Sequence, residues 1–468
     1  MKLSTLKEYL GDKVFYKTML KIAIPVSLQS LITVGVNLMD TVMLSSMGDA
    51  QLSASSQAGQ FITLFMIMCM GLGMGASVLT SRYFGMKEEH SLKSTITIMF
   101  RIALIFAVVF MIVTALIPSQ IMSVFSPDRE VIDYGAKYLY WMIPTFLCTG
   151  ITVPATVVLR SCNQVKIPLI SSIIAFFINI FCNWVFIFGE LGAPRMEIEG
   201  AALGTLIARV FELVFIFGYM VIFDKNIGYR IRHLFMKTGG LLSEFLRISV
   251  PVIISDTLLV LGTNIIAIIM GHIGTTFVTA NSVTAIVQQC STVFTQGISN
   301  ASGIITGQTM GQGHYEKAQK QGYTFAFTGL IFGLFAALII LILRQPILDY
   351  YQVSAEAKEI AGELMNAILI TVIFQSVNSV LTKGVLRAGG DTKFLMVGDV
   401  LFLWVAAVPL GALAGLVWHL PSFWIFILLK IDQFIKAIWC MFRLSSGKWL
   451  KRIRTEDEIQ QKALQDTE

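Results

Sequence analysis

The two halves of this chain are copies of each other, and this duplication is the strongest constraint on its fold. A gap-free shift of about 226 residues aligns seven identical positions, and one further residue of shift aligns four more. The matched positions are Pro25 and Pro251, Gly48 and Gly274, Ala54 and Ala280, Ser56 and Ser282, Gly71 and Gly297, Thr80 and Thr306, Gly85 and Gly311, Gly135 and Gly362, Leu159-Arg160 and Leu386-Arg387, and Lys166 and Lys393. Self-similarity over such a distance means that one structural unit is used twice.

Composition places both copies in a lipid bilayer. Of the 468 residues, 55% are hydrophobic and 14% are charged, which is too little polar surface for a soluble globular protein. Windows of about 20 apolar residues, the length that crosses the hydrocarbon core as a helix, predict twelve spans. The spans are expected at 17–44, 53–80, 94–117, 133–158, 168–189, 200–223, 245–271, 278–307, 321–343, 359–386, 394–418 and 421–443. These runs are continuous, whereas a β-barrel needs alternating polarity, so we expect an all-α membrane protein.

The distribution of charge predicts the orientation of the chain. Lys and Arg crowd the N-terminus, alternate loops and the C-terminal tail, so the formal charge of +6 reports topology and no nucleic-acid partner is expected. By the positive-inside rule both termini are cytoplasmic, most simply in the cell membrane. Six spans per copy make the copies parallel repeats. The expected domains are an N-terminal six-helix lobe (1–223), a basic cytoplasmic linker (224–244), a C-terminal six-helix lobe (245–446) and a charged tail (447–468).

Asp40 is the most informative residue within a span. A charged side chain at bilayer depth is costly, so each one is a functional hypothesis. Asp40 lies deep in the first span, and Asn37 precedes it by three residues on the same helical face, where it could hydrogen-bond either protonation form of the carboxyl group. We interpret Asp40 as a candidate carrier of protons. The alternative is a structural hydrogen bond, because the 45–49 loop is only several residues away.

Other polar residues inside spans leave two interpretations open. Asn179 and Asn183 share one face of the fifth span and could complete a polar pocket around Asp40 or bond across helices. Asp256 in the seventh span is either a second functional carboxylate or the partner of a basic neighbour. Arg209 and Glu212 can pair at i, i+3 and are interpreted as structural. The same structural or snorkelling role is expected for other charged residues near span ends, which are Asp399, Lys430, Asp432 and Lys436.

Three further features bear on a cavity. Met66, Met70 and Met74 form a stripe on the second span that would suit a pocket for unlike apolar molecules, or ordinary packing. Pro25 interrupts the first span about one half-span from Asp40 and is the expected hinge. The chain has no Gly-rich loop ending in Gly-Lys-Ser/Thr, no His-Glu-x-x-His helix and no Gly-x-Ser-x-Gly turn. We therefore expect neither an enzyme nor a bound cofactor.

Several local motifs together resemble one family of membrane proteins. They are Met39-Asp40-Thr41-Val42-Met43 followed by Gly48 and Ala54, the loops Leu159-Arg160-Ser161-Cys162-Asn163-Gln164 and Leu386-Arg387-Ala388-Gly389-Gly390-Asp391-Thr392-Lys393, and Glu199-Gly200-Ala201-Ala202. From about Leu20 to Leu444 the chain resembles the multidrug and toxic compound extrusion (MATE) family of cation-coupled drug exporters. The resemblance implies two V-shaped six-helix lobes, a monomer, and alternating access in which entry of H+ or Na+ drives expulsion of organic cations.

The resemblance also assigns residues. Asp40 is similar to the family's cation-coupling aspartate, and Asn179 to its fifth-span asparagine partner. Asn183 stands where several members have a second aspartate, and Thr205 is placed at the sixth-span threonine of the same site. Two acidic residues of a second site in one sodium-coupled branch fall at Leu259 and at about Ser376, which weakens a sodium site there, although Asp256 could replace part of it. The expected substrate pocket includes Asn37, Met66 and Met70, and Na+ is the one metal ion implied.

Two alternative functions stay open at this stage. A flippase of the same wider superfamily would move lipid-linked oligosaccharides and would need cationic residues in its cavity to meet pyrophosphate, and the spans offer few. A membrane channel or sensor is the alternative from another class, and it would lack substrate-coupled ion flux. The residues do not name the substrate or decide between H+ and Na+.

Overall fold

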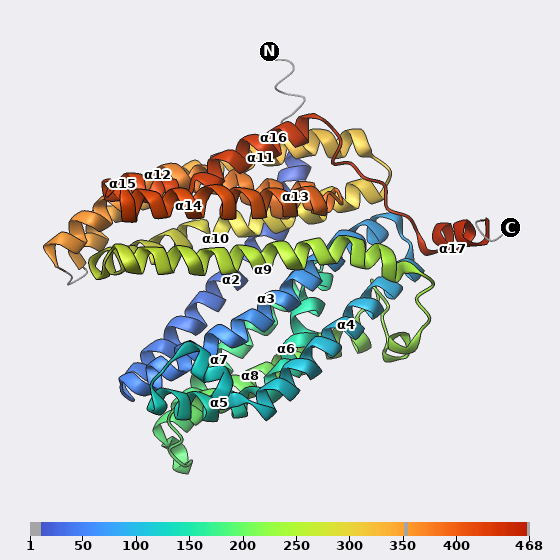
Figure 1. The fold of residues 1–468 in the computed structure, drawn as a ribbon. Helices are drawn as coiled ribbons and strands as arrows, with labels where there is room; N and C mark the ends of the chain where they lie inside the picture. Colours follow the sequence, from blue (N-terminus) through green and yellow to red (C-terminus); the bar gives the residue numbers. More distant parts are fainter. Residues whose placement is uncertain (1–10, 351–353, 466–468) are drawn as a thin grey trace. The chain divides into compact units, whose positions relative to one another are not determined.

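The computed structural model describes residues 11–350 and 354–465, and every regular element in those ranges is helical (Figure 1). Each of the twelve predicted spans overlaps a helix or a pair of consecutive helices. In the first copy these are α2 (Lys13–Ser45), α3 (Asp49–Met86), α4 (Glu89–Leu116), α6 (Arg129–Ser161), α7 (Lys166–Phe188) and α8 (Ile198–Gly218). In the second copy they are α9 (Leu241–Ile273), α10 (Thr275–Gly311), α11 (Tyr315–Tyr350), α12 (Ala355–Ser379), α13 (Thr392–Val400) with α14 (Val408–Ala412), and α15 (Ser422–Leu429) with α16 (Ile431–Ser445).

Ten helical stretches in the described ranges are long and apolar enough to cross a membrane on their own. The two other predicted spans have local reasons for falling short. Helix α10 carries many Ser, Thr and Gln residues, which lower its hydropathy. The last span is divided at Lys430, which lies between α15 and α16 with a φ of −117°. The all-α membrane fold predicted from the sequence is therefore confirmed, and the break at Lys430 is a feature that the apolar run concealed.

Four stretches of the spans are wider π-helical turns. They are η2 (Tyr219–Phe223), η4 (Val380–Leu386), η5 (Leu401–Ala407) and η6 (Leu413–Val417). A π-helical turn accommodates an extra residue in a helix and often occurs at a functional site. Three of the four lie in the second copy, and η4 carries the exposed side chain of Lys383.

The chain divides into two compact units, each described here by itself. The N unit consists of Leu28–Ile253 and Arg454–Glu468, and the C unit of Met1–Ser27 and Ile254–Ile453. The boundaries fall inside α2 and α9, each two residues after a proline, Pro25 or Pro251. Those positions are equivalent in the repeat, so each copy contributes the first part of its leading helix to the other unit. The lobe limits 1–223 and 245–446 stay a prediction.

Glycines allow these exchanged helix segments to pack closely. In the N unit, a Cβ atom at Gly75 of α3 would lie 2.6 Å from the Cα of Ser249 on α9, and one at Gly71 would lie 3.2 Å from the Cα of Ile253. In the C unit, a Cβ atom at Gly297 of α10 would overlap Ser27 of α2. Gly71 and Gly297 are repeat equivalents, so in both units a glycine at the same position allows two helix backbones to approach closely.

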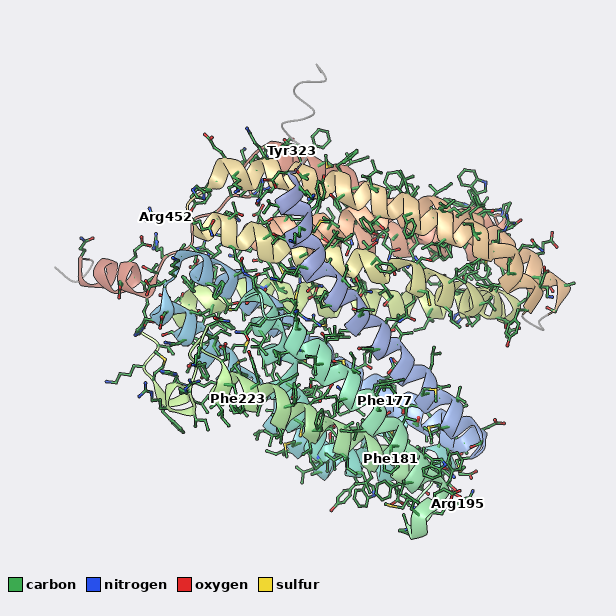
Figure 2. All side chains as sticks on the ribbon, turned by 180° about the vertical axis from the view of Figure 1, so that it is seen from behind. Phe177, Phe181, Arg195, Phe223, Tyr323 and Arg452 are labelled. Atoms are coloured by element: carbon green, nitrogen blue, oxygen red, sulfur yellow. The ribbon has the colours of Figure 1, made fainter. Side chains whose placement is uncertain are left out.

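Apolar side chains fill the interior of each unit and also cover much of its exterior. In the N unit, Phe65 and Phe146 pack edge to face with ring centroids 5.0 Å apart. Phe177, Phe181 and Phe223 lie on the outside of the same unit (Figure 2), with exposed fractions of 64%, 55% and 69%. Large exposed apolar side chains are costly in water and suited to lipid. The exterior therefore agrees with a bilayer environment.

The described part of the C-terminal tail, residues 447–465, contains buried and hydrogen-bonded side chains. Trp449 is completely buried in the C unit, and its indole Nε1 donates to Gln319 Oε1 over 2.8 Å. In the N unit, Tyr83 donates its hydroxyl hydrogen to the Arg454 carbonyl over 2.7 Å, and the Glu456 amide donates to Ser91 Oγ over 3.1 Å. Helix α17 (Glu456–Gln465) follows. The sequence predicted only a charged tail, and the buried Trp449 is the part that this charged composition concealed.

Candidate functional site

Asp40 meets the predicted asparagines inside the N unit. It lies on α2, and its Oδ1 accepts a hydrogen bond from Asn183 Nδ2 of α7 over 2.6 Å. Asn183 also donates to Asn179 Oδ1 over 3.5 Å, and Asn179 Nδ2 reaches Thr205 Oγ1 of α8 over 3.4 Å. Residues from three helices thus form one polar chain. Their proximity follows from the i, i+4 spacing of the two asparagines, which points both amides to one face of α7.

Burial makes this chain sensitive to changes in charge. Asn183 is completely buried and Asn179 is 3% exposed, while Asp40 is half-buried. Asn183 Oδ1 is buried and has no hydrogen-bond partner among the described residues. A Cβ atom at Gly204 of α8 would collide with that oxygen. The glycine therefore leaves room for the asparagine amide, which has an unused acceptor next to the Asp40 carboxylate.

Arg209 and Glu212 follow Thr205 on α8 and form the expected pair. The Arg209 Nη1 and Glu212 Oε2 atoms are 2.7 Å apart, and Glu212 is 9% exposed. Arg209 is close enough to act electrostatically on Asp40, but its charge is largely met by Glu212. Asp40 is therefore the ionisable group of this cluster with no paired countercharge.

Three other predicted residues are less closely tied to Asp40. Asn37 has an exposed side chain and makes no hydrogen bond to Asp40, because Asn183 occupies that position from the neighbouring helix. Met66 is half-buried and Met70 is 45% exposed on α3. Pro25 lies inside α2, which remains helical across it. The roles of these residues as pocket and hinge remain predictions.

Asp256 belongs to an ion pair in the C unit. Its two carboxylate oxygens lie 3.0 and 3.2 Å from the terminal nitrogens of Arg387, whose side chain is 4% exposed. This is the basic neighbour that the sequence left open as an alternative. Because both oxygens already face a guanidinium, Asp256 is engaged in neutralising a buried charge.

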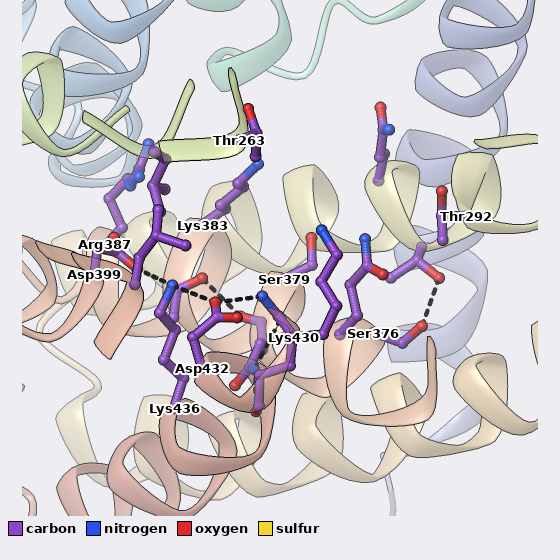
Figure 3. Close-up of a pocket in the computed structure, with 18 of the residues that line it drawn as sticks. Thr263, Thr292, Ser376, Ser379, Lys383, Arg387, Asp399, Lys430, Asp432 and Lys436 are labelled. Carbon is purple, nitrogen blue, oxygen red and sulfur yellow. Dashed lines mark hydrogen bonds and ion pairs between the residues drawn. The ribbon is translucent and has the colours of Figure 1, made fainter. Parts of the chain in front are cut away.

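A polar cavity of about 250 Å³ lies next to this ion pair in the C unit (Figure 3). Four cationic side chains line the cavity. Lys383 lies on η4, and Arg387 directly follows that segment. Lys430 and Lys436 lie in the last span, at its break and on α16. Lys436 lies 3.1 Å from Asp399 and 3.1 Å from Asp432. The Ser255 hydroxyl also donates to Asp399 over 2.6 Å.

Sequence reasoning missed this cavity because it assigned each charged residue separately to a span end. Asp399, Lys430, Asp432 and Lys436 were expected to have unrelated structural or snorkelling roles, yet all four line one cavity. The available signal was the density of ionisable residues in 430–436. Among the described residues, no group of three or more His, Cys, Asp or Glu side chains could hold a metal ion.

A duplicated six-span helical fold with buried ionisable groups in both copies defines a multi-pass membrane transporter of the inverted- or parallel-repeat type. The MatE family model matches residues 25–185 and 251–413, which correspond to the two copies. The chain belongs to this family, the MATE transporters, as its motifs predicted. It is therefore a transporter and not an enzyme.

Individual relatives agree with this assignment. The probable multidrug resistance protein NorM of Thermotoga maritima is 23% identical over 98% of this chain and 100% of its own length. A solved outward-facing multidrug resistance MATE family transporter of the MOP superfamily superposes with a TM-score of 0.84 at 17% identity, covering 94% of this chain and 98% of that one. A MOP superfamily transporter from Pyrococcus furiosus, described as having a binding pocket of reverse polarity, superposes with a TM-score of 0.83 at 16% identity and the same coverage. These structural likenesses establish the fold.

Proposed function

We propose that this chain exports lipophilic, mostly cationic drugs or toxic compounds by alternating access, in exchange for a cation that enters through the Asp40 site. The observation that carries the proposal is the chain of hydrogen bonds from Asp40 through Asn183 and Asn179 to Thr205. It provides one carboxylate inside a membrane helix bundle whose charge can be cancelled by a proton. Relatives named as multidrug resistance proteins support the substrate class.

The side-chain amide of Asn183 can respond to the protonation state of Asp40. With Asp40 ionised, its Oδ1 accepts the hydrogen bond from Asn183 Nδ2. Protonation gives Asp40 an O–H donor, and Asn183 Oδ1 is a buried acceptor that a rotation of the amide would present to it. The two protonation states would therefore favour two amide orientations. Such a local change can bias the arrangement of the helices when each state binds the ligand with different affinity.

The coupling ion of the proposal is H+, with Na+ as the alternative. Hard cations such as Na+ prefer several oxygen ligands, and Asp40 is the single carboxylate in the chain of hydrogen bonds that runs through Asn183 and Asn179 to Thr205. The nearest partner of its Oδ1 is an amide nitrogen at 2.6 Å, which occupies the position that a bound metal cation would take. A proton needs only the carboxylate itself.

Substrate and proton are linked through the charge of Asp40. An organic cation binds more tightly when Asp40 is negative, and protonation removes that attraction. By reciprocity, a bound organic cation lowers the affinity for the proton by the same factor. Met66 and Met70 provide the apolar part of the proposed pocket. The proposal places the protein in the cell membrane as a monomer with both termini in the cytoplasm.

The test is export of ethidium from proteoliposomes under an imposed pH gradient or an imposed Na+ gradient. Wild type is expected to export with the pH gradient alone, and Asp40→Asn to lose that export. Asp128→Asn is the matched control, since Asp128 is exposed and Asn is an equally good cap for α6. Export by Asp40→Asn at the wild-type rate, with unchanged pH dependence, would overturn the role of Asp40.

One observation favours a second candidate function. The lysine-lined cavity of the C unit supplies the cationic groups that a flippase of lipid-linked oligosaccharides needs to meet pyrophosphate. If neither gradient drives ethidium export in wild type or Asp40→Asn, the flippase becomes the preferred function. A channel or sensor would show no coupling of ion flux to substrate.

A further inference from the structure

The cavity of the C unit has an excess of positive charge. Three carboxylates pair with two of its four cationic side chains. Asp256 pairs with Arg387 over 3.0 and 3.2 Å, and Lys436 lies 3.1 Å from both Asp399 and Asp432. These contacts fix Arg387 and Lys436 in place. They leave Lys383 and Lys430 to be explained.

Lys383 and Lys430 make no ion pair or hydrogen bond with any described residue, although both line the cavity. Lys383 is held on the π-helical segment η4, and Lys430 at the break between α15 and α16. Figure 3 shows both side chains directed away from the ion pairs of Lys436. Irregular backbone within a membrane protein is tolerated where it lines a cavity, and it often presents groups to a ligand. Both lysines are presented in this way.

A buried donor in the same cavity also lacks a partner. Arg387 is 4% exposed and uses its terminal nitrogens on Asp256, but its Nε has no acceptor among the described residues. An unsatisfied buried donor is costly, and it points to an acceptor that the chain itself does not supply. Two ammonium groups without a described partner therefore line the cavity, and Arg387, which also lines it, has an unused guanidinium N–H.

The first copy of the repeat does not contain this arrangement. The positions equivalent to Lys383 and Lys430 are Thr156 and Leu203. Arg160, equivalent to Arg387, donates to the neutral Gln29 Oε1 over 2.5 Å. The lysines are thus not a requirement of the six-helix fold, which the first copy builds without them. Unpaired charges in a membrane bundle are costly unless a ligand or water meets them.

We propose that this cavity binds the negatively charged group, a carboxylate or a phosphate, of an amphipathic ligand. Lys383 and Lys430 supply the countercharge, and Arg387 Nε donates a hydrogen bond. Apolar lining residues, Leu259, Ile266 and Leu403, contact the neighbouring part of the ligand. As a step in export the inference rests on the proposed function, and it extends the substrate class to acidic and zwitterionic compounds. Binding itself does not depend on export.

The test measures binding to the full-length protein in nanodiscs of neutral phosphatidylcholine, with no ion gradient. Two fluorescent probes are compared: dansylglycine, which carries a carboxylate, and dansylglycinamide, which is neutral and otherwise alike. Empty nanodiscs give the lipid background. The proposal predicts that the carboxylate binds at least tenfold more tightly than the amide. Equal affinities for the two probes would overturn it.

Substitutions test whether Lys383 and Lys430 cause the preference for the carboxylate probe. Lys383→Gln with Lys430→Gln should remove the tenfold preference, while Lys383→Arg with Lys430→Arg should keep it because the charges remain. Neither lysine has an ion-pair partner within residues 11–350 and 354–465, so the replacements leave no described carboxylate without its partner. Lys317→Gln with Lys393→Gln is the matched control, since both are exposed on the C unit outside the cavity. A preference that survives in the Lys383→Gln, Lys430→Gln variant contradicts the assignment.

A second lipid composition distinguishes the sources of the anion. If phosphatidylglycerol in the nanodisc weakens dansylglycine binding to wild type but not the residual binding to the Gln variant, the cavity accepts a lipid headgroup phosphate. If it weakens neither, the ligand is a soluble anion. Asp40→Asn should bind dansylglycine normally. Absence of gradient-driven ethidium export by wild type together with an intact carboxylate preference therefore refutes only the proposed function. Export by wild type without the carboxylate preference refutes only this inference.

Discussion

The two copies of the repeat place their buried polar groups at different positions and with opposite balances of charge. In the N unit, one carboxylate without a paired countercharge faces neutral amides. In the C unit, four cationic side chains line one cavity, and three carboxylates pair with two of them. Under the shift that aligns the copies, Asp40, Asn179, Asn183, Thr205 and Arg209 correspond to Ile266, Ala406, Leu410, Asp432 and Lys436. The same helical frame therefore holds an acidic site in one unit and a basic cavity in the other.

One shared residue shows how the units diverged. Arg160 and Arg387 are repeat equivalents, both almost fully buried. Arg160 donates a hydrogen bond to the neutral Gln29, which in turn donates to Ser172 over 2.8 Å. Arg387 instead pairs with the carboxylate of Asp256. Ser172 is equivalent to Asp399, so the acceptors around the arginine are neutral in one copy and ionised in the other. The repeat fixes the frame, and individual substitutions set the charge.

The largest effect should come from removing the charged acceptor. Asp256→Ala leaves Arg387 buried without its carboxylate, which costs about 3–5 kcal/mol of stability, while Gln29→Ala removes a neutral acceptor and costs about 1–3 kcal/mol. Unfolding in detergent, followed by circular dichroism, measures both. Adding Arg387→Leu to Asp256→Ala should recover most of the loss. A larger loss of stability in Gln29→Ala than in Asp256→Ala would contradict the proposed difference between the two units.

A change at Gly204 should disturb the N unit alone. In Gly204→Ala the new Cβ atom overlaps Asn183 Oδ1, so the 2.6 Å bond to Asp40 is lost or lengthened. A hydrogen bond to a charged group contributes about 1.5–3 kcal/mol, and we expect export to slow by about tenfold or more. Gly218→Ala on the same helix is the control, because its Cβ would meet nothing within 4 Å. Equal export by the two variants would contradict the role of Asn183. The second copy has Ile431 at the equivalent position, so it has no such requirement.

The smallest predicted effect concerns the linker, which packs on the N unit. Burial, followed by the charges of Lys93, Arg232 and Arg230, holds the pKa of His233 below its usual value. Its Nδ1 accepts the Arg230 amide hydrogen over 2.9 Å, which requires the neutral ring. The neutral ring therefore stabilises this segment at neutral pH, and that contribution is lost as the pH falls through the lowered pKa.

Hydrogen exchange of residues 229–236 measures this loss. Exchange should accelerate modestly from pH 7 to pH 5, after correction for the intrinsic rate, with no such change in His233→Asn if the asparagine accepts the same bond. An unchanged protection factor in wild type over that range would show that the ring does not act as an acceptor in solution.

The sequence predicted the fold and the N-unit cluster well for a physical reason. Twelve apolar runs determine twelve helical spans, and the spacing of Asn179 and Asn183 puts both amides on one face. The contact of Asn183 with Asp40 joins residues 143 positions apart, and only the asparagine side chain offered a hint of it. Asn37, close to Asp40 in sequence, was the more obvious partner and is exposed instead.

The C-unit cavity could not be predicted in the same way. Its geometry depends on a helix break at Lys430 and on the π-helical segment that carries Lys383, and neither has a distinct sequence signal. Lys436 was expected to snorkel to the membrane surface, yet it lies between Asp399 and Asp432 and is 5% exposed. Ion pairs between distant segments decide such cases, and periodicity does not report them.

The most direct test of the account is proton release on drug binding by purified protein in weakly buffered detergent solution. If Asp40 carries the coupling proton, ethidium should displace up to about half a proton per wild-type molecule at the midpoint of the Asp40 titration, where half of the molecules are protonated, as reciprocal linkage requires. Asp40→Asn should release none, while Lys383→Gln with Lys430→Gln should release as much as wild type. Release that persists in Asp40→Asn would contradict the central claim that the N-unit carboxylate couples the ion to the substrate.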